Sequence, residues 1–276
     1  MQELPRHWEN DMDRIRITKN KGVCAITFHR PDQLNAIDDD MTRELTRIFE
    51  DLATDTDTRV VTIAGAGKHF SAGGDLSNIS SWLSPDPDTR GETFSNAVRT
   101  LSKPFALALQ NVPQPVVVAV RGHAIGIALQ IVLLADLVVA SETAKFTLPQ
   151  VSLAHVPDHG ETWSLARKVG MSRAMQMTLM SECIDAVTAE RFNLVNWVTP
   201  DNDLDERLAS IAASLAACPP VALRSTKSLM VAAADQSLSQ ALDGEIEMLG
   251  KVARQDDFVE AITAFTEKRK PVFKGH

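Results

Sequence analysis

Two stretches of small residues, each following an apolar run, are the best candidates in this sequence for stabilising a negative charge. The first spans Val60–Leu76, where a β-branched run typical of a buried strand is broken by Gly65 and Gly67. Small residues let the backbone approach a ligand closely and leave N–H groups unpaired. Asp75 is suited to cap a following helix, so Gly74 would lie where free amides and the helix dipole favour negative charge. We therefore expect an oxyanion hole built from backbone N–H groups.

Other uses of the same glycines are less well supported. A dinucleotide-binding fingerprint requires glycine at the sixth position of G-x-G-x-x-G, and that residue is Phe70. A phosphate-binding P-loop is excluded because no Gly-Lys-Ser/Thr follows at the required distance. A glycine-rich turn without a chemical role stays open on these residues alone. A second stretch of similar design, Val116–Gln130, favours the chemical interpretation.

The composition limits the classes of protein and partner. The 276 residues are 44% hydrophobic, which is enough for one large domain and an appendage. A formal net charge of −8 argues against nucleic acid and anionic membranes as main partners. Cys24, Cys183 and Cys218 are odd in number and widely spaced, so we expect neither a disulfide nor a zinc site, and a cytoplasmic location. The N-terminus is too polar for a signal peptide, and no apolar run reaches the length of a membrane span.

The apolar periodicity predicts an α/β pattern of strand, small-residue turn and helix. A polar lead-in over 1–13 precedes a hairpin around Asn20-Lys21-Gly22. Residues 77–92 predict a surface loop, with a lid over a ligand as the less favoured alternative. The other expected elements up to residue 140 are strands at Ile15–Thr18 and Val23–Phe28, a helix over 38–52, a strand at Val60–Ala64, a helix over 93–111, a strand at Val116–Val120, a turn at Arg121–Gly126, a helix over 127–134 and a strand at Leu137–Ala140.

The second half of the chain changes character after Pro200. An irregular segment is expected from Phe146 to Gly160, and four consecutive helices without intervening strands are expected beyond residue 200. We therefore expect two parts, a core over 1–199 that carries the site and a helical region over 200–276. The expected elements are helices over 161–169, 172–180 and 187–193, a strand at Val195–Val198, and helices over 204–217, 220–233, 237–253 and 256–267.

Four motifs in the same order resemble those of the crotonase superfamily, also called the enoyl-CoA hydratase/isomerase family. Arg30-Pro31 with Asn35-Ala36 is similar to its R-P-x-x-x-N-A turn, and Lys68–Leu76 is similar to its F-x-A-G-x-D-L signature. Pro115–Asp136 resembles the strand, turn and helix that supply a second oxyanion donor. Residues 264–274 resemble its C-terminal F-x-E-K-R-K-P segment. The resemblance covers nearly the whole chain.

The resemblance implies a spiral of ββα turns followed by a helical region that forms a trimer, or a dimer of trimers. It implies an acyl-CoA thioester as substrate, with coenzyme A as part of the substrate and no other cofactor or metal. The N–H groups of Gly74 and Ile127 would hold the thioester oxygen, which stabilises an enolate. The positions implied for binding are Arg30 and Lys68 beside phosphates or adenine, Ala72, Asp75 and Leu76 near the adenine, Ala36 elsewhere in the substrate site, His123 in the wall, and Phe265 and Lys268 from a neighbouring subunit. For the charged residues among them, ordinary surface placement is the alternative.

Two glutamines depart from the pattern of the hydratases. Those enzymes use two glutamates to hold and activate water, and the matching positions here are Gln130 and Gln150. Because a neutral amide cannot take a proton at pH 7, two-glutamate hydration is disfavoured. The glutamines would orient water or substrate, or satisfy buried backbone groups.

Asp158 is the charged candidate that remains, since its position resembles that of a catalytic aspartate in dienoyl-CoA isomerases and in a dehalogenase. The dehalogenases also use a helix histidine, whose position here is Lys103, so that chemistry is disfavoured. With Asp158 as the base, the leading hypothesis is an enoyl-CoA isomerase. The alternative for Asp158 is to cap the helix that begins near Gly160.

Other functions stay open on the same residues. His155, His159 and Glu161 crowd the segment around Asp158, and a His–Asp pair that activates water would suit a hydrolase of a β-dicarbonyl. A hydratase with non-standard residues is a second alternative. A non-catalytic acyl-CoA-binding trimer is the third.

Overall fold

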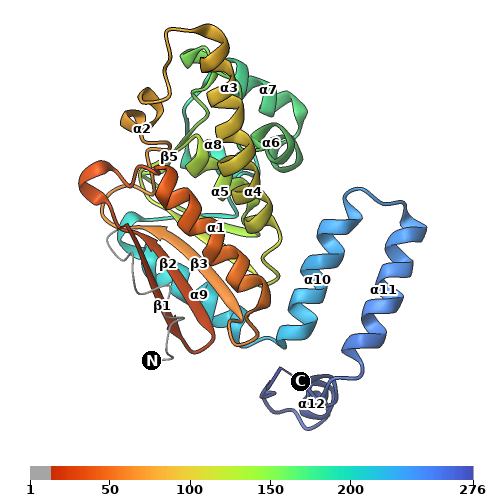
Figure 1. The fold of residues 1–276 in the computed structure, drawn as a ribbon. Coiled ribbons are helices and arrows are strands. Elements are labelled where there is room, and N and C mark those ends of the chain that lie inside the picture. The colour runs from red at the N-terminus through yellow and green to blue at the C-terminus, as the bar shows by residue number, and fades with distance from the viewer. Residues whose placement is uncertain (1–13, 276) are drawn as a thin grey trace.

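The computed structural model describes residues 14–275 (Figure 1), so the polar lead-in predicted over 1–13 lies outside the described residues. Its main sheet has six strands in the order β1-β2-β3-β4-β6-β9. β1 and β2 pair antiparallel, and the other neighbours pair parallel. The strands are β1 (Ile15–Asn20), β2 (Val23–Phe28), β3 (Val60–Gly65), β4 (Val116–Val120), β6 (Leu137–Ser141) and β9 (Trp197–Thr199).

The hairpin between β1 and β2 follows the prediction. Asn20 pairs with Val23, which leaves Lys21 and Gly22 as a two-residue turn. Both have positive φ, 49° and 79°, the geometry that suits the twist of a tight hairpin. The strands expected at Leu137–Ala140 and Val195–Val198 are also present, with ends shifted by one or two residues.

A second sheet of three very short strands was not expected. It consists of β5 (His123–Ile125), β7 (Lys145–Thr147) and β8 (Ile184–Asp185) in the order β5-β7-β8. The predicted turn at Arg121–Gly126 and the irregular segment from Phe146 are therefore wrong where β5 and β7 lie. Strands of two or three residues are too short to show an alternating pattern.

The helices follow the predicted rhythm in most places. They are α1 (Asp39–Thr54), α2 (Leu76–Ser80), α3 (Pro87–Ala97), a π-helical turn (Val98–Ser102), α4 (Lys103–Gln110), α5 (Ile127–Leu134), α6 (Glu161–Val169), α7 (Met171–Leu179), α8 (Ala186–Arg191), α9 (Leu204–Ala216), α10 (Pro220–Ala233), α11 (Leu238–Val252) and α12 (Asp256–Thr266). Short 3₁₀ turns lie at Pro31–Gln33, Val151–Leu153 and Asp201–Asp203.

The segment 77–92, predicted as a surface loop, contains most of α2 and the start of α3. Asp75 caps α2 by accepting a hydrogen bond from Ser77 N, as predicted. Asp86 caps α3 by accepting a hydrogen bond from Thr89 N, and Pro87 is the first helical residue. The Ser, Pro and Asp residues that favoured a loop are also the residues that begin helices.

Apolar side chains cover both faces of the main sheet. On one face, Phe28, Phe49 and Phe105 belong to a large core that also takes in residues of α1, α4 and α5. On the other face, Val117 and Val139 belong to a smaller core with Leu204 and Ile211 of α9. Every residue of β4 is buried, as the continuous β-branched run predicts. The division of the chain at residue 200 stays a prediction, and α9 just beyond it packs on the sheet.

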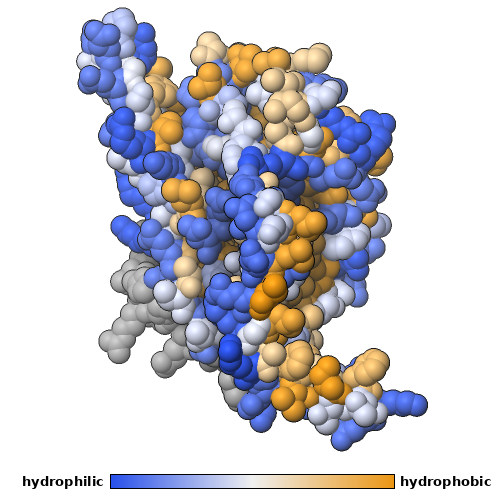
Figure 2. All heavy atoms as spheres, turned by 90° about the vertical axis from the view of Figure 1, so that its right-hand side faces the viewer, coloured by the Kyte–Doolittle hydropathy of each residue, from blue (hydrophilic) through white to orange (hydrophobic). Residues whose placement is uncertain are grey.

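The last three helices bury few residues. Figure 1 shows α10 and α11 side by side next to the body, with α12 below them. Within the described chain, α11 has no buried residue and α10 has only Pro220. Figure 2 shows apolar patches on the face that carries these helices. Their exposed apolar side chains include Met230, Leu238, Leu242, Ile246, Leu249, Val259, Ile262 and Phe265.

No single helix in residues 14–275 is long and apolar enough to cross a membrane. One pair bent by 104°, Asp201–Ala216 with Pro220–Ala233, passes the same test of length and composition when taken together.

Candidate active site

The Gly74 N–H lies between two backbone hydrogen bonds that tie its loop to residue 37. Ile37 N donates to Gly73 O at 2.8 Å, and Asp75 N donates to Ile37 O at 2.9 Å. This parallel bridge leaves the Gly74 N–H without a hydrogen-bond acceptor among the described residues. The loop therefore presents one free backbone donor, and its role in an oxyanion hole stays a prediction.

The Ile127 N–H is the first amide of α5, where no intrahelical acceptor exists. Gly126 precedes it with φ 54° and ψ −121°, a conformation that L-residues with a side chain rarely adopt. Gly126 N donates to Thr147 O of β7 at 3.1 Å, which fixes the turn. The helix dipole adds positive potential at the same amide.

Backbone hydrogen bonds hold the two donor segments together. Ser71 N donates to His123 O at 2.8 Å, and Ile125 N donates to Ser71 O at 3.3 Å. A Cβ atom on Gly73 would lie only 2.5 Å from Ile125 O, so glycine is required for this approach. The loop that ends in Gly74 and the strand that leads to Ile127 are thus paired directly.

Two stacked imidazoles join the same segments. The rings of His69 and His123 have centroids 4.8 Å apart and planes within 10° of parallel. His123 N donates to His69 Nδ1 at 3.3 Å. Burial, the neighbouring His123 and the Lys68 charge hold the pKa of His69 below its ordinary value, which favours the neutral ring as the acceptor. His123, expected in the substrate wall, lies against His69.

Arg30 is tied to the loop that carries the first donor. Its guanidinium donates to Ala36 O at 2.6 Å and lies 3.2 Å from the carboxylates of both Asp38 and Asp75. The hydrogen bond from the Ser77 hydroxyl, supported by Arg30, holds the pKa of Asp75 below its ordinary value. Two carboxylates therefore already balance the charge that was expected to face CoA phosphates.

The other residues expected to bind CoA lie at different depths. Lys68 and Leu76 are exposed, whereas Ala36 and Ala72 are half-buried. Phe265 is 85% exposed. Figure 1 shows α12, which carries Phe265, at the end of the molecule opposite to α2, so a single chain does not bring it to the donor loops.

Asn35 holds the donor loop from inside. Its side chain is fully buried, its Oδ1 accepts from Arg30 N at 2.9 Å, and its Nδ2 donates to Ala66 O and His69 O at 2.9 and 2.8 Å. Its φ is 53°, a left-handed conformation that asparagine tolerates better than most residues. These bonds explain structurally why Asn35 stands in this motif.

We expect Asn35→Ala to lower the free energy of unfolding by about 3 kcal/mol, because one N–H and two carbonyls, all partly buried, lose their partner. Urea unfolding measures the change. Asn193→Ala is the matched control, since Asn193 is exposed and also left-handed, with φ 63°. We expect it to cost about 1 kcal/mol. Equal losses in the two variants would mean that backbone strain alone explains the effect and that the three hydrogen bonds contribute nothing.

Gln130 and Gln150 are both buried, with 1% and 8% of their surface exposed. Gln130 Oε1 accepts from the Ser164 hydroxyl at 2.7 Å. Gln150 Nε2 donates to Glu161 Oε1 at 3.2 Å, and Gln150 Oε1 is buried without a hydrogen-bond partner among the described residues. Both amides are therefore held by side chains of α6.

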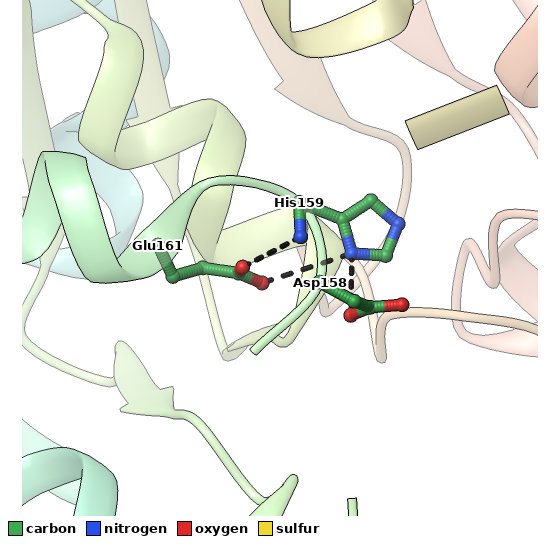
Figure 3. Close-up of side chains that lie close together, drawn as sticks. All are labelled: Asp158, His159 and Glu161. Carbon is green, nitrogen blue, oxygen red and sulfur yellow. Dashed lines mark hydrogen bonds and ion pairs between the residues drawn. The ribbon is translucent and has the colours of Figure 1, made fainter. Parts of the chain in front are cut away.

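Asp158, His159 and Glu161 form one charged cluster (Figure 3). His159 Nδ1 lies 2.9 Å from Asp158 Oδ1 and 3.7 Å from Glu161 Oε1. His159 N donates to Glu161 Oε2 at 2.8 Å. Burial disfavours the imidazolium, but the hydrogen bond to Asp158 and the two negative charges outweigh burial and raise the pKa of His159 above its ordinary value.

The structure excludes the helix-capping alternative for Asp158. Gly160 is the residue before α6, and no side chain makes a capping hydrogen bond there. The Asp158 carboxylate, with about a fifth of its side-chain surface exposed, instead faces His159. Proton acceptance from a ligand is compatible with this partial exposure.

The same three side chains are the set within residues 14–275 that could hold a metal ion, since one ligand atom from each lies within 4.8 Å of the others. His159 Nδ1 is already hydrogen-bonded to Asp158. A network of charges and hydrogen bonds therefore accounts for the cluster.

An aromatic group connects the 77–92 segment to the segment before Asp158. Trp82 and Phe94 pack edge to face with centroids 5.5 Å apart, and the Phe94 and His155 rings lie 5.9 Å apart. The sequence pattern did not mark Trp82 and Phe94 as functional residues. Two aromatic residues in a largely polar stretch are the sequence feature that could have indicated this contact.

Known proteins are similar to this chain in sequence and fold over almost their whole lengths. Residues 18–276 match the family model described as enoyl-CoA hydratase/isomerase. The 1,2-epoxyphenylacetyl-CoA isomerase of Escherichia coli (strain K12) is 31% identical over 264 residues, covering 96% of this chain and 99% of that protein. The 2,3-dehydroadipyl-CoA hydratase of the same organism is 32% identical over 266 residues, covering 96% and 100%. The crystal structure of an enoyl-CoA hydratase from Bacillus anthracis superposes with a TM-score of 0.87 at 29% identity, covering 95% of this chain and 100% of that one.

Proposed function

The chain belongs to the enoyl-CoA hydratase/isomerase family and has the crotonase fold, and on that premise we propose that it moves a double bond in an acyl-CoA thioester. The N–H groups of Gly74 and Ile127 hold the thioester oxygen. Asp158 removes a proton from one carbon, the electron pair moves onto the thioester oxygen to form an enolate, and the proton returns at another carbon. Both steps use one carboxylate and consume no water.

The observation that carries this proposal is the chemistry of the buried side chains. Gln130 and Gln150 stand where the hydratases have glutamates, and both are neutral amides already bound to α6. Asp158 is a partly exposed carboxylate, and it is linked to Gln150 by contacts through His159 and Glu161. One base and a backbone oxyanion hole are sufficient for isomerisation.

Binding of coenzyme A completes the proposal. The backbone of Ala72–Leu76 lies beside the adenine together with Ala36, and exposed Lys68 approaches a phosphate. Phe265 and Lys268 reach this site from a neighbouring subunit of a trimer or of a dimer of trimers. The exposed apolar side chains of α10–α12 support such an assembly. Coenzyme A enters as part of the substrate, and the mechanism requires no other cofactor.

Hydrolysis of a β-dicarbonyl is the second candidate, and one specific observation favours it. The hydrogen bond between His159 Nδ1 and Asp158 Oδ1 is the arrangement in which a carboxylate orients an imidazole that activates water. In that mechanism His159 is the base, and the enolate hole stabilises the carbon leaving group.

The test incubates the purified protein in D2O with 3-enoyl-, dienoyl- and 2-enoyl-CoA thioesters. Ultraviolet absorbance follows migration of the double bond, and mass spectrometry follows deuterium uptake. We expect migration with deuterium incorporated at the carbons that exchange protons. A cyclic β-diketone is included as the substrate of the second candidate.

Each other outcome points to a different function. Rapid hydration of 2-enoyl-CoA without migration would contradict the isomerase proposal and favour a hydratase. Cleavage of the diketone alone would favour the hydrolase. Binding of the thioesters without any deuterium exchange would leave a non-catalytic binding protein. Protein inactivated by heat controls for uncatalysed exchange.

A further inference from the structure

The donor loop and β5 form a short parallel ladder in which one backbone bond is missing. Ser71 N donates to His123 O at 2.8 Å, and Ile125 N donates to Ser71 O at 3.3 Å. In a regular parallel ladder the next bond would run from His123 N to the carbonyl of His69. That carbonyl instead accepts from Asn35 Nδ2 at 2.8 Å. His123 N therefore needs another acceptor.

The imidazole of His69 takes the place of that carbonyl. Its Nδ1 accepts from His123 N at 3.3 Å. The ring lies close to the backbone before β5, since a Cβ atom on Gly122 would lie only 2.4 Å from His69 Nδ1. Gly122 also has φ 55°, a conformation that favours glycine. A bond that a sheet normally forms between backbone groups thus depends on a side chain that can take up a proton.

The hydrogen bonding of the two stacked rings suits neutral imidazoles. His69 Nδ1 has to be unprotonated to accept, which leaves the ring hydrogen on Nε2. His123 Nδ1 is buried with no hydrogen-bond partner within residues 14–275, so the same tautomer suits the second ring. Because the ring centroids are 4.8 Å apart, a charge on one ring opposes a charge on the other.

The charges around the pair do not compensate a protonated His69. The charges that act on it are those of Lys68 and His123, and both disfavour a further positive charge. Within residues 14–275 neither ring forms an ion pair with a carboxylate. The other charged residues on the paired segments and their neighbours are Arg121 with its partner Asp201, and Lys145 with its neighbour Asp185.

We propose that His69 and His123 are positioning residues that hold the two oxyanion donors in register only while both rings are neutral, so that acid loosens the oxyanion hole before the protein unfolds. A proton on His69 Nδ1 turns the acceptor into a donor that faces the His123 N–H. The broken bond lies five residues before Gly74 and four before Ile127. The inference rests on the proposed function, because it assumes that these two N–H groups hold the thioester oxygen.

Hydrogen exchange of the intact protein tests the pairing without any substrate. Mass spectrometry follows exchange at about pH 7.5 and about pH 5, each normalised to the intrinsic rate. We expect peptides that cover His123–Ile127 to lose about tenfold of their protection in acid, because an opened His69 has the ordinary pKa of about 6.5 and the closed one has a lower pKa. Peptides of β4 are the internal reference and should keep their protection.

Two substitutions of His69 separate its acceptor from its charge. In His69→Asn the Oδ1 atom replaces Nδ1 as acceptor and does not titrate, so we expect acid to change the protection of β5 by less than twofold. His69→Leu has neither acceptor nor charge and should show the weaker protection at both pH values. His29→Asn is the matched control for the loss of one imidazole, since His29 Nδ1 has no partner among the described residues, and it should keep the wild-type response to acid.

Deuterium exchange at the α-carbon of butyryl-CoA connects the pairing to the site. Between about pH 7.5 and about pH 5 the rate should fall about tenfold further in the wild type than in His69→Asn. The comparison cancels the titration of Asp158 and His159, which both proteins share. Absence of α-proton exchange in every protein would count against the enolate chemistry, and the hydrogen-exchange result would still decide the role of the histidine pair in the ladder.

Three results would overturn the proposal. The first is an equal loss of β5 protection by acid in the wild type and in His69→Asn. The second is an equal loss in β5 and β4, which would mean that the whole body opens. The third is an equal fall of the α-proton exchange rate in the wild type and in His69→Asn, which would separate the ladder from the oxyanion hole.

Discussion

Ile127→Pro is expected to lower the rate of α-proton exchange by about 10²–10³, the usual effect of removing one donor from an oxyanion hole. Ile127 is the first residue of α5, a position where proline is well tolerated because its N–H has no intrahelical acceptor. Gly126 before it has ψ −121°, close to the mirror image of the extended backbone that a residue before proline requires. The substitution therefore removes the donor while the helix remains.

Ile127→Ala is the matched control for that experiment, because it shortens the same buried side chain and keeps the N–H. We expect it to lower the stability and to keep most of the exchange rate. Circular dichroism checks that both variants retain the fold. If Ile127→Pro exchanged α-protons as fast as Ile127→Ala, the second donor would have to be sought elsewhere than at residue 127.

Asp158→Asn is expected to lower the rate of double-bond migration by about 10²–10⁴, the range for losing a positioned general base. The asparagine is nearly the same size and still contacts His159, so thioester binding should change by less than threefold. Because the Asp158 charge helps to raise the pKa of His159, that pKa should fall in the variant. Nuclear magnetic resonance of the imidazole follows the second effect independently of activity.

Asp57→Asn is the control for the loss of one carboxylate, since Asp57 is an exposed residue between α1 and β3. It should leave both migration and the titration of His159 unchanged. Full migration activity in Asp158→Asn, together with the lowered pKa of His159, would exclude Asp158 as the base although its contact with His159 is real.

Much of the architecture around Gly74 and Ile127 was predictable from local residue types. The β-branched runs of β3 and β4, the start of α5 at Ile127 and the capping of α2 by Asp75 all follow from local residue types. Branched side chains favour strands, and a carboxylate before a helix favours capping, so both features can be predicted from neighbouring residues alone.

The rest depends on contacts between distant segments. β5 and β7 are short and exist because they pair with each other, and α2 and α3 lie in a stretch whose composition also suits a loop. The spacing of Gln130, Gln150, Glu161 and Ser164 does not reveal that Gln150 contacts Glu161 and Gln130 contacts Ser164. Those contacts depend on the packing of α5 against α6, which no local pattern encodes.

The helices α10–α12 bury few residues, so we expect their local stability to be lower than that of the main sheet. Their backbone hydrogen bonds are sheltered by few buried side chains, so in a lone protomer their amides should open and exchange with solvent far sooner than those of β3 and β4. Binding of another copy to this face would slow that exchange in proportion to protein concentration. The proposed oxyanion donors, Gly74 and Ile127, lie outside α10–α12, so we expect the proposed site to stay ordered while these helices open.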